Sequence, residues 1–149
     1  MSNALYGSTL MNKALLDTDT LSEIRKGKAP PIIANARNYR RAYGHYSFST
    51  VTVLEIVSGY QKTQQLHYLH TFTASLAFEE IFPLDITAAE LAGRITGDLE
   101  RTGQIIGRAD PMIAAIAIDN GLELVTGNTA HYQRIQQLGY PLVLVNWRI

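Results

Sequence analysis

Cysteine is absent from the 149 residues of this chain, which excludes disulfide bonds and thiolate metal sites. No apolar run approaches the ~18 residues that cross a membrane, so we expect no membrane partner. The first ten residues, MSNALYGSTL, have neither the basic start nor the apolar core of a secretory signal. A chain without cysteine belongs by default in a reducing compartment, and we therefore expect a cytoplasmic protein.

Charge is balanced over the whole chain but not along it. Residues 1–70 hold eight Lys and Arg against four Asp and Glu, whereas residues 71–149 hold five against nine. The first half is therefore the better candidate for binding an anion such as nucleic acid, and the second for holding a cation. From length and composition we expect a leader over residues 1–12, disordered or added, and a single domain over residues 13–149.

Short apolar runs alternate with helical patterns along the chain. Strands are predicted at residues 14–16, 46–49, 81–84, 122–126 and 141–146. Helices are predicted at residues 21–26, 32–43, 50–60, 64–77, 88–101, 110–119 and 128–138. Strands that alternate with helices predict an α/β fold, with a parallel sheet covered by helices.

Two carboxylates follow the first predicted strand of the domain. In KALLDTDTLSE, residues 13–23, the apolar run ends at Asp17 and Asp19. Ligands bind beyond the carboxyl ends of strands in open α/β sheets, so these acids belong either to a site or to an ordinary turn. Thr18 or Asp19 is expected to cap the next helix, and the residue types alone favour the turn-and-cap interpretation.

Two further acids stand in unusual surroundings. Glu55 lies in the apolar segment TVTVLEIVSGY, and it either meets a cation, a donor or solvent there, or lies on an exposed helix edge. Asp110 precedes Pro111 and a nearly all-apolar helix, so it is either a helix cap or an acid held near the strand ends. Asn128 is a cap or an oxygen ligand beyond the next strand, where Thr126 can donate a hydrogen bond.

A cluster of Asp17, Glu55 and Asp110 near the strand ends would be unfavourable without a cation. Oxygen ligands favour Mg²⁺ or Mn²⁺ over zinc, and such an ion can activate a water for attack on a phosphodiester. His67 and His70 are three residues apart on a predicted helix, but two nitrogens do not make a zinc site.

Basic residues gather between positions 25 and 41. The candidates for RNA contact are Arg25, Lys26, Lys28, Arg37, Arg40 and Arg41. Tyrosines at positions 39, 43 and 46 would suit single-stranded nucleic acid, in which bases stack on aromatic rings. The alternative is an ordinary solvated helix face.

The tetrapeptide DTDT at residues 17–20 also resembles the DxDxT signature of haloacid-dehalogenase-type phosphatases. That family needs a lysine and further acids downstream, whereas the last lysine here is Lys62 and the last acid is Glu123. The second half of that machinery is missing, and we reject this interpretation.

Taken together, the residues resemble the PIN-domain ribonucleases, and within them the VapC-type toxins of bacterial toxin–antitoxin pairs. The resemblance runs from Lys13 to Trp147 and rests on LLDTDTLSEIRKG, SFSTVTVLEIVSGY and IIGRADPMIAAIAIDNGLELVTGNTAHYQRI, in this order. It implies a PIN-like three-layer fold, with a small parallel sheet flanked by helices on both faces.

The resemblance also assigns roles to the candidate site residues. The catalytic, metal-holding acids of the family fall on Asp17, Glu55 and Asp110. Asn128 would be a weaker ligand, because many PIN domains place an Asp there, and one-ion and two-ion catalysis both stay open. Asp19 would support the ligands, and Thr126 would help to position a water or a phosphate.

The expected function is therefore that of a Mg²⁺-dependent endoribonuclease, with Mn²⁺ as the other candidate ion, acting as the toxin of a type II toxin–antitoxin pair. The resemblance implies RNA as substrate, a cognate antitoxin protein as inhibitor and a homodimer. The alternative is a non-catalytic PIN-like module that binds RNA or protein, which the neutral Asn128 keeps open. A DNA nuclease of the same architecture is a third candidate.

Overall fold

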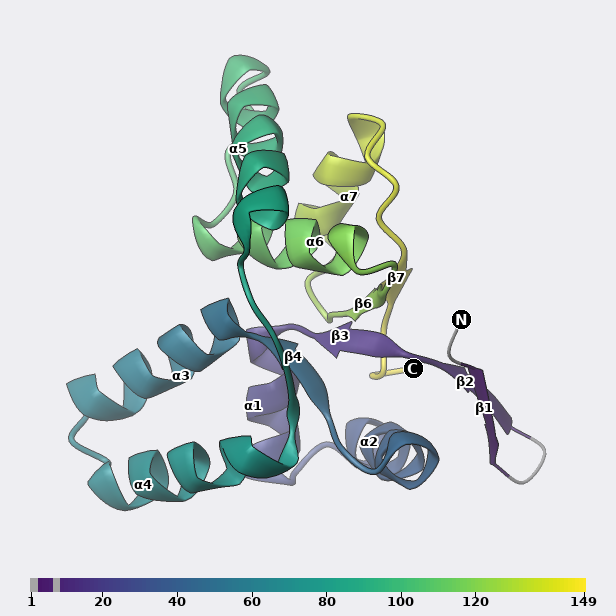
Figure 1. Cartoon of the computed structure of the whole chain (residues 1–149), viewed down its shortest axis with the longest axis vertical. Coiled ribbons are helices and arrows are strands. Elements are labelled where there is room, and N and C mark those ends of the chain that lie inside the picture. The colour runs from purple at the N-terminus through teal and green to yellow at the C-terminus, as the bar shows by residue number, and fades with distance from the viewer. Residues whose placement is uncertain (1–2, 7–8) are drawn as a thin grey trace.

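Five parallel strands form the central sheet of the computed structural model, which describes residues 3–6 and 9–149 (Figure 1). Their order across the sheet is β5-β4-β3-β6-β7. Their bounds are β3 (Ala14–Leu16), β4 (Ser47–Ser49), β5 (Glu80–Phe82), β6 (Glu123–Val125) and β7 (Leu144–Val145). Every neighbouring pair runs parallel, which confirms the predicted α/β fold.

Helices cover both faces of this sheet. They are α1 (Thr18–Lys26), α2 (Pro30–Tyr43), α3 (Thr50–Lys62), α4 (Leu66–Ser75), the short 3₁₀ helix η1 (Leu76–Phe78), α5 (Ile86–Arg101), α6 (Ala109–Asp119) and α7 (Thr129–Gln137). Figure 1 shows α1, α2 and α4 on one side of the strands and α5, α6 and α7 on the other. The predicted three-layer arrangement is confirmed.

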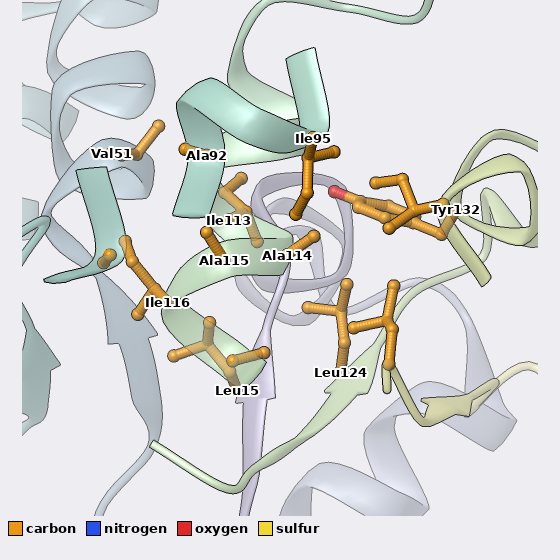
Figure 2. Packing of buried hydrophobic residues seen from close by; sticks show 14 of the residues in the cluster. Leu15, Val51, Ala92, Ile95, Ile113, Ala114, Ala115, Ile116, Leu124 and Tyr132 are labelled. Carbon is orange, nitrogen blue, oxygen red and sulfur yellow. The ribbon is translucent and has the colours of Figure 1, made fainter. Parts of the chain in front are cut away.

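Alternate residues of β3 supply the two cores. Leu15 packs with α5, α6 and α7, as Figure 2 shows for Ile113 and Ile116 of α6. Ala14 and Leu16 face the other way and pack against α1 and α2. Because successive strand residues point to opposite faces, an all-apolar strand is what a sheet covered on both sides requires.

The helix α1 begins earlier than predicted. It starts at Thr18 rather than Leu21, and its cap is Asp17 rather than Thr18 or Asp19. The Asp17 backbone is extended, and its Oδ1 accepts a hydrogen bond of 2.7 Å from the backbone N–H of Thr20. Asp17 thereby satisfies an N–H that the first helical turn leaves unpaired, and the helix starts directly at the strand end.

The described part of the leader forms two strands. β1 (Asn3–Tyr6) and β2 (Thr9–Asn12) pair antiparallel, and β1 lies against α2. Residues 1–2 and 7–8 lie outside the described residues. The division into a leader and a domain beginning at residue 13 stays a prediction. Within the described ranges, no helix is both long and apolar enough to span a membrane.

Candidate active site at the carboxyl edge of the sheet

The predicted site residues follow strands that are neighbours in the sheet. Asp17 comes directly after β3, Thr126 after β6, and Glu55 lies in the helix that follows β4. The backbone N–H of Asp17 donates to the carbonyl of Val125 at 3.0 Å and extends the β3–β6 ladder by one residue. Because these strands are parallel and adjacent, their carboxyl ends bring sequence-distant side chains to one edge.

Asp17 is the most deeply buried of the acids, with 4% of its surface exposed. Its carboxylate accepts hydrogen bonds from the Thr20 backbone and from the Thr126 hydroxyl. Burial raises the pKa of Asp17 above its ordinary value, and this effect outweighs the lowering by hydrogen bonds from Thr126 and from the backbone and side chain of Thr20. Asp17 is thus a helix cap and a buried acid at once, so the two interpretations of this residue do not exclude each other.

Glu55 is half-buried and faces α1. The Thr18 hydroxyl donates to its Oε1, and Thr18 Oγ1 also lies 3.0 Å from the hydroxyl of Thr52. Thr52 is one helical turn before Glu55 and lies on the same side of α3. This hydrogen bond ties the Glu55 side chain to the first residue of α1, the neighbour of Asp17 in the sequence.

Asp110 is not the helix cap that its place before Pro111 suggests. α6 begins at Ala109, with Arg108 at the cap position, so Asp110 lies inside the first turn. Its Oδ1 accepts a hydrogen bond of 3.2 Å from the Tyr132 hydroxyl, and its Oδ2 lies 3.4 Å from His131 Nδ1. Two side chains of α7 therefore hold this acid.

Asn128 stands at the cap position of α7, but its side chain makes no capping hydrogen bond. Its Nδ2 lies 2.9 Å from His131 Nδ1, and its backbone N–H donates to Thr126 Oγ1 at 2.9 Å. Thr126 thus links Asp17 to Asn128. We did not predict a role for His131 or Tyr132, although the spacing of three residues between Asn128 and His131 is a signal that places both on one helix face.

The pKa of Tyr132 is affected by the negative charge of the three acids at the carboxyl edge of the sheet. Burial raises the pKa of its phenol strongly, and the negative charges of Asp110, Asp17 and Glu55 raise it further. Three acids from distant parts of the sequence therefore lie within electrostatic reach of one phenol. The phenol stays protonated and serves as a neutral hydrogen-bond donor to Asp110.

The PIN domain family model matches residues 14–136. The chain belongs to the PIN-domain family. It is 31% identical to the tRNA(fMet)-specific endonuclease VapC of Shigella flexneri, over 84% of this chain and 93% of that protein. The enzyme of the same name from Salmonella typhimurium is 32% identical over the same shares.

Solved structures agree with the family. DNA-bound VapBC from Salmonella typhimurium is 28% identical, with a TM-score of 0.72 over 92% of this chain and 99% of that chain. VapBC2 from Rickettsia felis, bound to a promoter DNA fragment, shares the fold with a TM-score of 0.75 at 24% identity, over 90% of this chain and 98% of that chain. The resemblance to VapC-type PIN proteins is confirmed.

The acids of this PIN domain suit a hard divalent cation in type and charge. Among the described residues, no Lys or Arg pairs with Asp17 or Glu55, and the donors that reach them are neutral. As placed, no three His, Asp or Glu side chains of the described ranges come close enough to hold one ion together. Mg²⁺ binds through one or two carboxylates and keeps several waters, so this spacing is compatible with it.

The basic residues of this PIN domain divide between two places. Arg25 and Lys26 line a groove of about 520 Å³ between α1, α3 and α4, together with Glu55 and the rings of Tyr60 and Tyr68. Because Glu55 lies in the same groove, these cations share a surface with one of the three candidate acids.

The second basic group lies near the amino ends of the strands. Arg37, Arg40 and Arg41 line a different hollow beside Tyr46, which precedes β4. Arg40 is paired with Glu79 at 2.8 Å. Lys28 and Asp19 are exposed and lie at neither hollow.

Proposed function

We propose that this PIN domain is a Mg²⁺-dependent endoribonuclease and the toxin of a type II toxin–antitoxin pair. The observation that carries the proposal is that Asp17 and Glu55 follow neighbouring strands at one edge of the sheet, with Asp110 in the first turn of α6, and that no Lys or Arg pairs with the first two among the described residues. The relatives named tRNA(fMet)-specific endonuclease support RNA as the substrate.

Asp17, Glu55 and Asp110 would hold the ion, with Asn128 as a weaker ligand. Bound Mg²⁺ supplies a water of lowered pKa and stabilises charge on the phosphate. The chain orients each acid through neutral groups: Thr20 and Thr126 for Asp17, Thr18 for Glu55, and Tyr132 for Asp110. One of the carboxylates accepts the proton of the attacking water.

The groove beside Glu55 is the proposed path of the RNA. Arg25 and Lys26 supply positive charge there, and Tyr60 and Tyr68 supply rings for stacking. An antitoxin segment would lie over the same groove and its acid Glu55, and a homodimer in the cytoplasm is the proposed assembly. Toxin–antitoxin complexes among the solved structures of similar fold support the protein partner.

The test is cleavage of a mixed RNA pool and of initiator tRNA by purified protein, in Mg²⁺ and in EDTA. Asp17→Asn is the informative variant, because Asn caps a helix as well as Asp does and removes only the charge. Asp119→Asn is its matched control, since Asp119 is exposed at the far end of α6. We expect Mg²⁺-dependent cutting that survives in the control and disappears in Asp17→Asn.

A PIN-like binding module without turnover is the second candidate. The neutral Asn128 and the spacing of the acids favour it. Such a module retains RNA but leaves it intact with Mg²⁺ or Mn²⁺, in the folded protein free of antitoxin. Single-stranded DNA is tested beside RNA, because cleavage of the DNA would indicate a DNA nuclease rather than a ribonuclease or a binding module.

A further inference from the structure

A third basic position lies at the carboxyl edge, on the opposite flank from Arg25 and Lys26. Arg148 follows β7, the strand next to β6, and its side chain lies against Gly127. Gly127 separates Thr126, which hydrogen-bonds Asp17, from Asn128, which contacts His131. The strand order therefore brings this guanidinium beside the candidate site.

Gly127 makes the close approach of Arg148 possible. A Cβ atom at residue 127 would lie 2.5 Å from Arg148 Nε and 3.4 Å from Cζ. Real Cβ atoms do not approach other atoms so closely, so any larger residue would displace the arginine side chain. The guanidinium thus packs onto backbone rather than extending freely into solvent.

Two hydrogen bonds hold the backbone that leads into Arg148. Trp147 is buried, and its carbonyl accepts a hydrogen bond of 3.0 Å from Asn35 of α2. The Arg148 N–H donates to Asn146 Oδ1 at 2.9 Å. An arginine held in this way loses less conformational freedom on binding than a mobile one.

Arg148 is exposed on the side away from Gly127, and its side chain has no carboxylate partner among the described residues. An arginine presents several N–H donors in a planar fork that matches a phosphate, and its charge is permanent. Among the described residues, no Lys or Arg is paired with the acids Asp17 and Glu55. An RNA that crosses the carboxyl edge would meet this fork at β7, two β-strands from the end of β3 that Asp17 follows.

We propose that Arg148 binds a backbone phosphate of the RNA substrate, on the flank of the acids opposite to Arg25 and Lys26. The inference rests on the proposed function for the identity of the strand. It makes Arg148 a substrate-binding residue rather than a catalytic one. Its effect should be the same for RNAs of different sequence, since a phosphate contact carries no sequence information.

The first test is binding of a fluorescein-labelled single-stranded RNA, measured in EDTA so that cleavage does not interfere. Arg148→Gln is compared with Arg101→Gln, which removes the same charge at the far end of α5. We expect Arg148→Gln to weaken binding roughly fivefold, and to lower the slope of log K against log salt by about 0.7, the value for one phosphate on a single strand. Arg101→Gln should match the wild type.

The second test uses Gly127→Ala, which displaces the arginine but keeps its charge. We expect Gly127→Ala to weaken binding as Arg148→Gln does, and to add nothing in the double variant, because both changes remove one contact. With Mg²⁺, Arg148→Gln should raise KM and leave kcat nearly unchanged.

The outcomes separate this inference from the proposed function. If Asp17-dependent cleavage occurs but Arg148→Gln binds RNA as Arg101→Gln does, the inference is wrong and the nuclease stands. If Arg148→Gln weakens binding but no RNA is cut under any condition, the inference stands and the nuclease does not. If the wild-type protein binds no RNA in EDTA and cuts none in Mg²⁺, both are overturned.

Discussion

The hydrogen bond between Tyr132 and Asp110 can be tested by removing a single oxygen atom. The Tyr132 hydroxyl donates to Asp110 from a buried position. Tyr132→Phe removes this donor and leaves the ring in place, so we expect cleavage to fall roughly tenfold and the Mg²⁺ requirement to rise, with a loss of about 1 kcal/mol in stability. Cleavage against Mg²⁺ concentration and urea unfolding measure the two effects.

Tyr140→Phe is the matched control for that substitution. Tyr140 donates a hydrogen bond of 2.6 Å to Asp98, and neither residue is among the predicted site residues. Its loss should destabilise the fold to a similar extent and leave cleavage unchanged. Equal losses of activity in both variants would mean that Tyr132 acts only through folding.

The buried charge of Asp17, which the proposed function requires, should lower the stability of the fold at neutral pH. Because burial raises its pKa in the folded protein, the native state binds a proton more tightly than the unfolded chain does. The contribution of Asp17 to stability is thus full below the ordinary Asp value of 3.8 and is lost as pH rises through the raised folded-state pKa.

The expected result is that Asp17→Asn is more stable than the wild type at neutral pH. The gain should be about 0.5–2 kcal/mol, the common range for one stabilising substitution, and should shrink as pH falls toward 3.8. Urea unfolding in EDTA at several pH values measures it. A variant less stable than the wild type at pH 7 would show that the buried charge is not unfavourable.

At the scale of elements, the strands were predictable, and so were the starts of α3, α6 and α7 to within one residue. Every predicted strand overlaps one of the sheet, because short apolar runs between helical patterns mark buried parallel strands. The starts of α1 and α5 were missed by two to three residues, since Asp17 and Asp85 cap them in turns where apolar periodicity says nothing.

The candidate site was predictable to a similar depth. Strand ends located Asp17 and Thr126, which share a hydrogen bond, whereas the role of Glu55 and Asp110 as metal ligands stays a prediction. The contacts of Asp110 with His131 and Tyr132 depend on how α7 packs against α6, which no local sequence pattern specifies. Asp110 looked like a helix cap because it precedes Pro111, although α6 begins one residue earlier, at Ala109.

The helix α6 is the element whose packing should matter most for stability. Ile116 is fully buried in the core above the sheet (Figure 2), whereas Ile118 on the same helix is only partly buried. Ile116→Ala should cost about 3 kcal/mol and Ile118→Ala clearly less, because the first leaves a closed cavity. Urea unfolding of both variants checks this, and equal losses would contradict the packing described.

For the whole molecule, the division of basic charge predicts which surface binds RNA. Arg25 and Lys26 lie in the groove with Glu55, whereas Arg37 and Arg41 lie near the amino ends of the strands. Neutralising the first pair to Gln should weaken RNA binding roughly tenfold and lower the salt slope by about 1.4, for two phosphates. Neutralising the second pair should change neither. Equal effects would mean that RNA extends over both ends of the sheet.

The central claim is that Asp17, Glu55 and Asp110 act as one metal-dependent centre. The most direct measurement is kcat for RNA cleavage in Mg²⁺ by Asp17→Asn, Glu55→Gln, Asp110→Asn, and the Asp17→Asn/Asp110→Asn double variant. Groups that act as a unit are not additive, so each single variant should lose at least about 100-fold, and the double variant should be little worse. Losses that multiply in the double variant, or full activity in any single one, would contradict the claim.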